Sequence, residues 1–141
     1  MTPSPRTVLA AIVVLVVAAA VVGGFLVAGS PEEARMHRLD DRRVSDLKRI
    51  QGAVNVSWTR SRTMPDTIDA AMTTQAGVAA PVDPATGLGY EYRVVAGQSF
   101  ELCAVFDRTS DLQRSASDPS WAHVAGRQCF PLTARDLNKD R

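Results

Sequence analysis

The chain has 141 residues. An apolar N-terminal segment with its leader takes about 30 of them, so the remainder is enough for one small domain. Sixteen basic and fifteen acidic side chains give a formal net charge of +1, and the two signs are interspersed after Ser30. Because no stretch carries a strong field of a single sign, we do not expect nucleic acid as a partner.

An uninterrupted apolar run extends from Val8 to Gly29 and contains no charged residue. At about 1.5 Å per residue a helix over this run is roughly 33 Å long, slightly more than the hydrocarbon thickness of a bilayer. The run predicts a transmembrane anchor that follows a short leader, Met1–Thr7. A cleaved secretory signal is the alternative, since small residues at 27–29 stand near a possible cleavage point. The apolar core of such a signal usually has only about 7–15 residues, which favours a retained helix.

Two features give opposite predictions for the side of the membrane on which the rest of the chain lies. Arg6 alone precedes the anchor, whereas four basic residues soon follow it and favour the cytoplasm: Arg35, Arg38, Arg42 and Arg43. Cys103 and Cys129, in contrast, are an even and isolated pair, which is typical of a disulfide in an oxidising compartment. We expect a single-pass protein of the cell membrane whose C-terminal domain is extracytoplasmic, on the periplasmic side.

A long helix is expected directly after the anchor. Ser30-Pro31-Glu32-Glu33 has a capping serine, a proline at the first helical position and a glutamate three residues after the serine. From Ala34 to about Arg60, apolar residues recur at intervals typical of one helix face: Met36, Leu39, Val44, Leu47, Ile50, Val54 and Trp58. We interpret this stripe as a spine helix that packs on a sheet, with a partner helix as the alternative.

A short helix, a turn and a hairpin are expected next. The short helix opens at Met64-Pro65-Asp66 and continues to about Met72, and residues 83–87 have the Asp, Pro and Gly of a tight turn. The apolar period then changes to two, in residues 90–94 and 100–106, around an Ala96-Gly97-Gln98 turn. The apolar face of this hairpin should cover the spine helix.

The C-terminal part is expected to add a loop, a last strand and a polar tail. Residues 107–120 have few apolar side chains, as a loop does. Trp121–Val124 and Arg127–Phe130 predict a strand or a bent pair of strands that ends at Pro131. The tail from Leu132 to Arg141 should fray. The fold class is therefore α+β, with one domain over residues 30–131.

The order of these parts resembles the type IV pilins and, more closely, the type II secretion pseudopilins. The resemblance covers about residues 8–106 and is carried by Met64-Pro65-Asp66-Thr67-Ile68 and by Asp83-Pro84…Gly87…Tyr90-x-Tyr92. It implies a pilin-like domain outside the cytoplasmic membrane. The family's cleavage glycine and its Phe-Thr-Leu-x-Glu start are missing at Arg6-Thr7-Val8-Leu9, and the anchor contains no glutamate. Precursor processing and filament assembly are therefore not carried over.

Few residues of the sequence are candidates for a disulfide, a metal site or catalysis. A Cys103–Cys129 disulfide would close a loop of about 27 residues and contribute roughly 3–4 kcal/mol in the chain-entropy model. A metal site of both cysteines with His123 is the alternative, but it lacks closely paired ligands. Ser120 and Asp118 stand near His123, and His37 is the other histidine, but no nucleophile motif surrounds them, so we expect no enzyme.

A calcium site is a further hypothesis. Asp83 and Thr86 of the turn, joined by Asp107 or Asp111, would supply oxygen ligands, although the turn residues need no metal to form a turn. Two functions follow. The first is a non-enzymatic accessory component of an envelope assembly, whose partners are the membrane and other membrane subunits. The alternative is a membrane-tethered module that binds calcium or another ligand near the Asp83 turn and the 107–120 loop.

Overall fold

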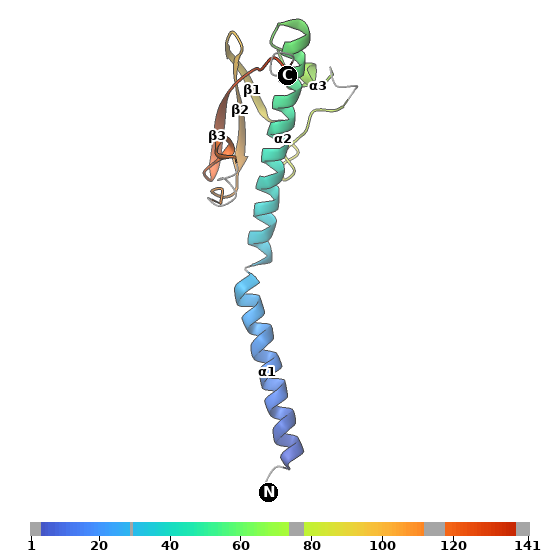
Figure 1. Cartoon of the computed structure of the whole chain (residues 1–141), viewed down its shortest axis with the longest axis vertical. Coiled ribbons are helices and arrows are strands. Elements are labelled where there is room, and N and C mark those ends of the chain that lie inside the picture. Colours follow the sequence, from blue (N-terminus) through green and yellow to red (C-terminus); the bar gives the residue numbers. More distant parts are fainter. Residues whose placement is uncertain (1–3, 29, 74–77, 112–117, 138–141) are drawn as a thin grey trace. The chain divides into compact units, whose positions relative to one another are not determined.

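The computed structural model describes residues 4–28, 30–73, 78–111 and 118–137. The chain divides into two compact units, Met1–Arg35 and Met36–Arg141, and each is considered by itself. Figure 1 labels the helices and strands in chain order.

The first unit is dominated by the helix α1, Pro5–Ala28. Its segment Pro5–Gly24 has a mean hydropathy of 2.7, and none of it is buried. Within the described residues this is the one helix that is long and apolar enough to cross a membrane, as the apolar run predicts. A signal sequence near the N-terminus can pass the same test of length and composition. Gly29, the last residue of the predicted anchor, lies outside the described residues.

The second helix, α2, extends over Pro31–Ser61 and starts as predicted. The backbone N–H of Glu33 donates to Ser30 Oγ at 3.1 Å, so Ser30 caps the helix and Pro31 takes the first helical position. α1 and α2 are therefore two separate helices, with a cap between them.

The buried face of α2 confirms the C-terminal half of the predicted stripe. Leu47, Ile50 and Val54 are completely buried. In the N-terminal half Met36, Leu39 and Val44 are only partly buried, although Val44 packs against the core as predicted. The buried positions there are polar, namely Asp40, Arg43 and Asp46.

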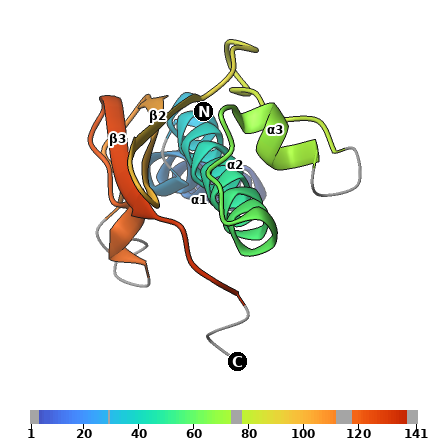
Figure 2. The same cartoon turned by 90° about the horizontal axis from the view of Figure 1, so that it is seen from above.

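The sheet has three antiparallel strands in the order β1-β2-β3, with bounds Glu91–Ala96, Ser99–Phe106 and Gly126–Thr133. The predicted hairpin is confirmed: β1 pairs with β2, and Gly97 in the turn has a φ of 55°, which favours glycine. On β2 one face is buried against α2, through Phe100, Leu102, Ala104 and Phe106. Figure 2 shows α2 between the sheet and a short helix, α3 (Ile68–Thr73).

α3 is shorter than predicted, Ile68–Thr73. Thr67 caps it, since its Oγ1 accepts the backbone N–H of Ala70 at 3.1 Å. Pro65 is therefore not in the helix. It is buried, and its carbonyl accepts the Tyr92 hydroxyl at 2.9 Å, which ties this segment to β1.

Two expectations for the last strand are wrong. Residues Pro119–Trp121 form a single 3₁₀ turn and 122–124 are not in a strand, so only the second of the two predicted strand segments exists. Pro131 does not end β3, because it pairs with Glu101 and the strand continues to Thr133. β3 is an edge strand, where a missing N–H can face away from the sheet at no cost.

The tail does not fray over residues 132–137, contrary to the prediction. Leu132 and Thr133 belong to β3, and the buried Ala134 donates its N–H to the Gln98 carbonyl at 2.8 Å. The N–H groups of Arg135 and Leu137 then donate to side-chain oxygens on α2, at 3.0 and 3.1 Å. The tail therefore closes the domain against α2 as far as Leu137. Residues 138–141 and the loop residues 112–117 lie outside the described part.

Candidate functional site

A buried ion cluster centred on Arg43 joins three parts of the second unit. Its Nε donates to Asp83 Oδ2 at 2.6 Å, and its Nη1 donates to Asp40 Oδ1 and Asp107 Oδ2, each at 2.7 Å. The side chains of Arg43 and Asp40 are only 4% and 5% exposed. One guanidinium therefore links α2 to the 83–87 turn and to the segment that follows β2.

Backbone N–H groups hold the carboxylates of this cluster. Asp83 Oδ1 accepts the N–H groups of Ala85 and Thr86, both at 2.9 Å, and the Thr86 hydroxyl at 3.2 Å. The two oxygens of Asp40 accept the backbone N–H groups of Asp107 and of the next residue, at 3.0 and 2.9 Å. Because a buried charge is costly unless it is paired and hydrogen-bonded, these bonds make the cluster tolerable inside the domain.

Burial disfavours the charged forms of Arg43 and Asp83, but their hydrogen bonds outweigh this cost. Desolvation lowers the pKa of Arg43, yet the hydrogen bonds to Asp83, Asp107 and Asp40 raise this pKa above the ordinary value for arginine. Desolvation raises the pKa of Asp83, yet the bonds from Arg43 and from the turn's N–H groups lower it to about 2. Both groups are therefore charged at neutral pH.

The residues expected to bind calcium are engaged otherwise. Asp83 and Asp107 both bind Arg43, and Thr86 donates its hydroxyl to Asp83, so the positive charge between the two carboxylates is supplied by the guanidinium. Asp111 lines a different region. Within the described ranges, no group of three or more Asp, Glu, His or Cys residues is arranged to hold a metal ion.

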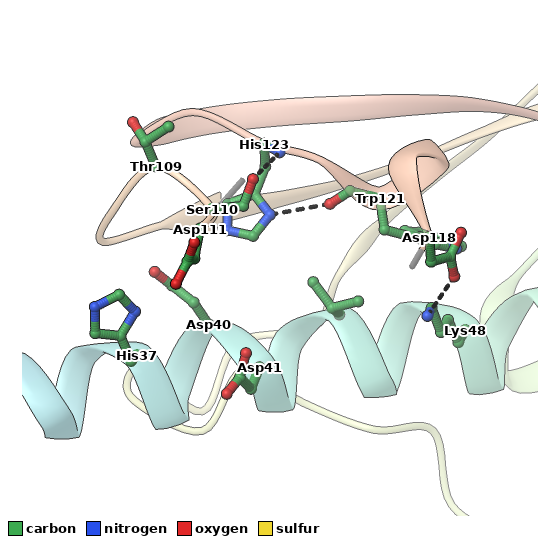
Figure 3. Close-up of a pocket in the computed structure, with 11 residues that line it drawn as sticks. His37, Asp40, Asp41, Lys48, Thr109, Ser110, Asp111, Asp118, Trp121 and His123 are labelled. Carbon is green, nitrogen blue, oxygen red and sulfur yellow. Dashed lines mark hydrogen bonds and ion pairs between the residues drawn. The ribbon is translucent and has the colours of Figure 1, made fainter. Parts of the chain in front are cut away.

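A pocket of about 150 Å³ lies between the first half of α2 and the segments before β3 (Figure 3). His37 and Asp41 of α2 line one wall, and Ser110, Asp111 and His123 line the other. Figure 3 shows the ring of His123 directed from the loop toward α2. The sequence separates the two histidines widely, but the fold brings both to this pocket.

His123 is held rigidly in the pocket wall. It is 8% exposed, and its ring stacks on Phe106 with the ring centroids 3.8 Å apart. Its Nδ1 lies 3.1 Å from the Trp121 carbonyl oxygen, which only accepts, so Nδ1 carries a hydrogen. Its backbone N–H donates to Ser110 Oγ at 3.1 Å, and its carbonyl accepts the Ser110 N–H at 2.9 Å. In the neutral ring Nε2 is then an acceptor.

The residues considered for catalysis do not form a nucleophile–base pair. Ser120 Oγ lies 2.7 Å from Asp118 Oδ1, and the same carboxylate pairs with Lys48 at 2.6 Å. The bond to Lys48 is the main reason why the pKa of Asp118 is lowered. The ring of His123 binds the Trp121 carbonyl and not Asp118. The Asp118–Lys48 pair therefore ties this segment to α2, and Ser120 bonds within the segment.

Cys103 and Cys129 form the predicted disulfide, between directly paired residues of β2 and β3. The neighbours of Cys103 on β2, Leu102 and Ala104, face the core, so the sulfurs lie on the other face of the sheet. There Arg127 pairs with Glu91 at 2.6 Å, and its Nη2 lies 3.6 Å from Cys103 Sγ. Because oxidised cysteines cannot ligate as thiolates, the alternative metal site with His123 is wrong for this structure.

Comparisons with known proteins find no relative of this chain. The chain matches no family model, and searches of curated proteins and of solved structures likewise found no match. The pilin resemblance therefore stays a prediction.

Sequence reasoning missed the Arg43 cluster, although a signal for it exists. Steps of four and three residues back from the buried Leu47 reach Arg43 and Asp40, which continue the same helix face. Charged residues on a core-facing row are expected to have buried partners of opposite sign. The sequence does not show which acidic residues these are, because Asp83 and Asp107 come from distant segments.

Proposed function

We propose that this chain is a membrane-anchored, non-enzymatic interaction protein, an accessory component of a cell-envelope assembly that resembles a pseudopilin. The observation that carries the proposal is the exposure of the apolar helix α1. None of its apolar segment Pro5–Gly24 is buried in the protein. Apolar surface of this extent requires a covering of lipid or of other apolar helices.

The disulfide supports an extracytoplasmic domain. Bonds of this kind persist in oxidising compartments and are rare in the cytosol, where thiols are kept reduced. Cys103 and Cys129 are the only two cysteines of the chain, and both are used in the bond. On this argument α1 crosses the cell membrane once and the unit Met36–Arg141 lies outside the cytoplasm, against the positive-inside count.

The use of the polar groups supports an interaction role over catalysis. Arg43 and its carboxylates hold the fold together, and Tyr90 donates its hydroxyl to the buried Asp46 at 3.1 Å. The pilin-like part of the proposal rests on the packing of α2 against an antiparallel sheet and on the 83–87 turn that leads into Tyr90 and Tyr92. The calcium-binding alternative is not favoured, because its two central carboxylates bind Arg43.

Membrane retention tests the anchor directly. The wild-type chain, expressed in a bacterial host, should stay in the membrane pellet after an alkaline wash, with an intact mass that includes α1. The double variant Leu15→Arg, Val16→Asp places two charges in the apolar window, where each costs about 2.5–3.5 kcal/mol, and should be released. The control Leu15→Ala should be retained. A wild-type chain that is cleaved after the apolar segment and released would contradict the proposal.

The assembly role needs a second measurement. Purified in mild detergent, the wild-type chain should carry integral membrane subunits of the envelope in fixed ratio, and the Leu15→Arg, Val16→Asp variant should not. A wild-type chain that is retained in the membrane but purifies alone would leave the anchor standing and remove the assembly role.

A further inference from the structure

The pocket in Figure 3 contains a ring nitrogen, His123 Nε2, that takes no part in holding the fold together. Phe106, Trp121 and Ser110 fix the ring, tautomer and backbone of the buried His123. In the part of the chain that the structure describes, nothing is bonded to its Nε2, and the residue lines the pocket. Among the described residues no buried side-chain nitrogen or oxygen lacks a partner, so the unbonded Nε2 is accessible from the pocket. A rigid acceptor that is open to a pocket can take a donor from outside the chain.

The charge of the pocket favours a cation as that donor. Asp41 and Asp111 stand on opposite walls, whereas the Lys48 ammonium is already paired with Asp118 at 2.6 Å. Asp41 and Asp111 each have a partner in the chain, so it is their charge, and not an open oxygen, that favours a cation.

The size of the pocket restricts the ligand further. Its volume of about 150 Å³ is below the roughly 300–1,000 Å³ of pockets that enclose a whole small-molecule ligand. It suits one compact functional group at the end of a chain. An ammonium concentrates its charge and three donors on one atom, whereas a guanidinium is a wider, planar fork.

We infer that this pocket binds a primary ammonium group, which donates to His123 Nε2 and lies in the field of Asp41 and Asp111. The Ser110 hydroxyl, on the same wall as His123, is a second acceptor within the pocket. A lysine side chain of a partner protein and a free small amine both present this group. The inference adds a ligand site to the proposed interaction role and does not depend on the side of the membrane.

The test uses the full chain in detergent micelles with ¹⁵N-labelled histidine. Titration with n-butylammonium should shift the Nε2 resonance of His123 saturably, and n-butanol, a neutral molecule of similar shape, should not. Asp41→Asn and Asp111→Asn should each weaken binding by up to about fivefold, the upper range for a partly exposed ion pair. The control Asp69→Asn, an exposed aspartate on α3, should leave the affinity unchanged.

Two outcomes would overturn the inference: equal shifts with n-butanol and n-butylammonium, or unchanged affinity in both aspartate variants. A response to Zn²⁺ with none to the amine would overturn it too and indicate a metal site. The capped amino acid N-acetyl-lysine amide separates the two sources. If it binds as well as n-butylammonium, the natural ligand is a protein side chain, and if only the free amine binds, it is a small amine.

Discussion

The guanidinium of Arg43 and the carboxylate of Asp83, forty residues apart in the chain, lie 2.6 Å from each other inside the domain. Their contact holds the 83–87 turn against α2. The turn leads through Tyr90 into β1, whose partner β2 supplies most of the sheet's buried face. The Arg43–Asp83 salt bridge thus helps to position the sheet on α2, and the apolar core also holds the sheet there.

Removal of Arg43 should destabilise the domain strongly. Arg43→Met leaves the carboxylates of Asp40 and Asp83 buried without a counter-charge, and loss of one partner of a buried pair costs about 3–5 kcal/mol. Urea unfolding of the full chain in detergent measures the change. Arg49→Met removes an exposed arginine from the same helix and should change stability little. Equal midpoints for the two variants would show that the cluster contributes nothing.

Acid should weaken the domain through Asp83. The pKa of Asp83 in the folded chain is about 2, below its ordinary value of 3.8. Its contribution is therefore fully present above about pH 4 and is lost as the pH falls toward 2, by about 2 kcal/mol in all. Asp83→Asn should flatten the stability curve over this range, while the exposed Asp69→Asn keeps the wild-type slope. A wild-type slope in Asp83→Asn would contradict the assignment.

The disulfide should supply a large share of the stability. Its cysteines are 26 residues apart, for which the chain-entropy model gives roughly 3–4 kcal/mol. Cys103→Ala with Cys129→Ala should lower the unfolding free energy by about this amount. Reduction of the wild-type chain should lower it similarly and should not affect the double variant. If the oxidised wild type and the variant melt together, the bond does not stabilise the domain.

The apolar half of α2 should not tolerate charge. Leu47 is fully buried among the core residues, so Leu47→Asp should unfold the domain, and Leu47→Ala should cost about 2–5 kcal/mol. The exposed neighbour Ser45→Asp is the control and should fold normally. Circular dichroism and amide exchange on the full chain report both results. A folded Leu47→Asp variant would mean that this face is not the core.

The sequence predicted those parts of the fold in which local pattern and packing agree. Alternation identified the hairpin, the Asp83 turn followed from its Asp, Pro and Gly, and the cysteine pair indicated the disulfide. Before Leu47 the apolar stripe accounts for only part of the buried face of α2, because hydrophobic periodicity does not register a buried row of charged residues such as Asp40 and Arg43. Pro131 and the 3₁₀ turn at 119–121 were misplaced, since strand ends depend on tertiary pairing.

The pocket could not be predicted from sequence for a related reason. Its walls come from α2 and from segments more than sixty residues later, and the fold alone brings His37 near His123. The sequence hypothesis placed a ligand site near both the Asp83 turn and the 107–120 loop; the pocket includes Thr109, Ser110 and Asp111 but not Asp83.

The most direct test is to determine on which side of the membrane the disulfide-bonded domain lies. We would fuse alkaline phosphatase after Arg141 in a bacterial host and label the thiols of Cys103 and Cys129 before and after reduction. An extracytoplasmic, disulfide-bonded domain should give high phosphatase activity and thiols that react only after reduction. An inactive fusion with thiols that react at once would mean that the arginines after the anchor set the orientation, and would contradict an extracytoplasmic role.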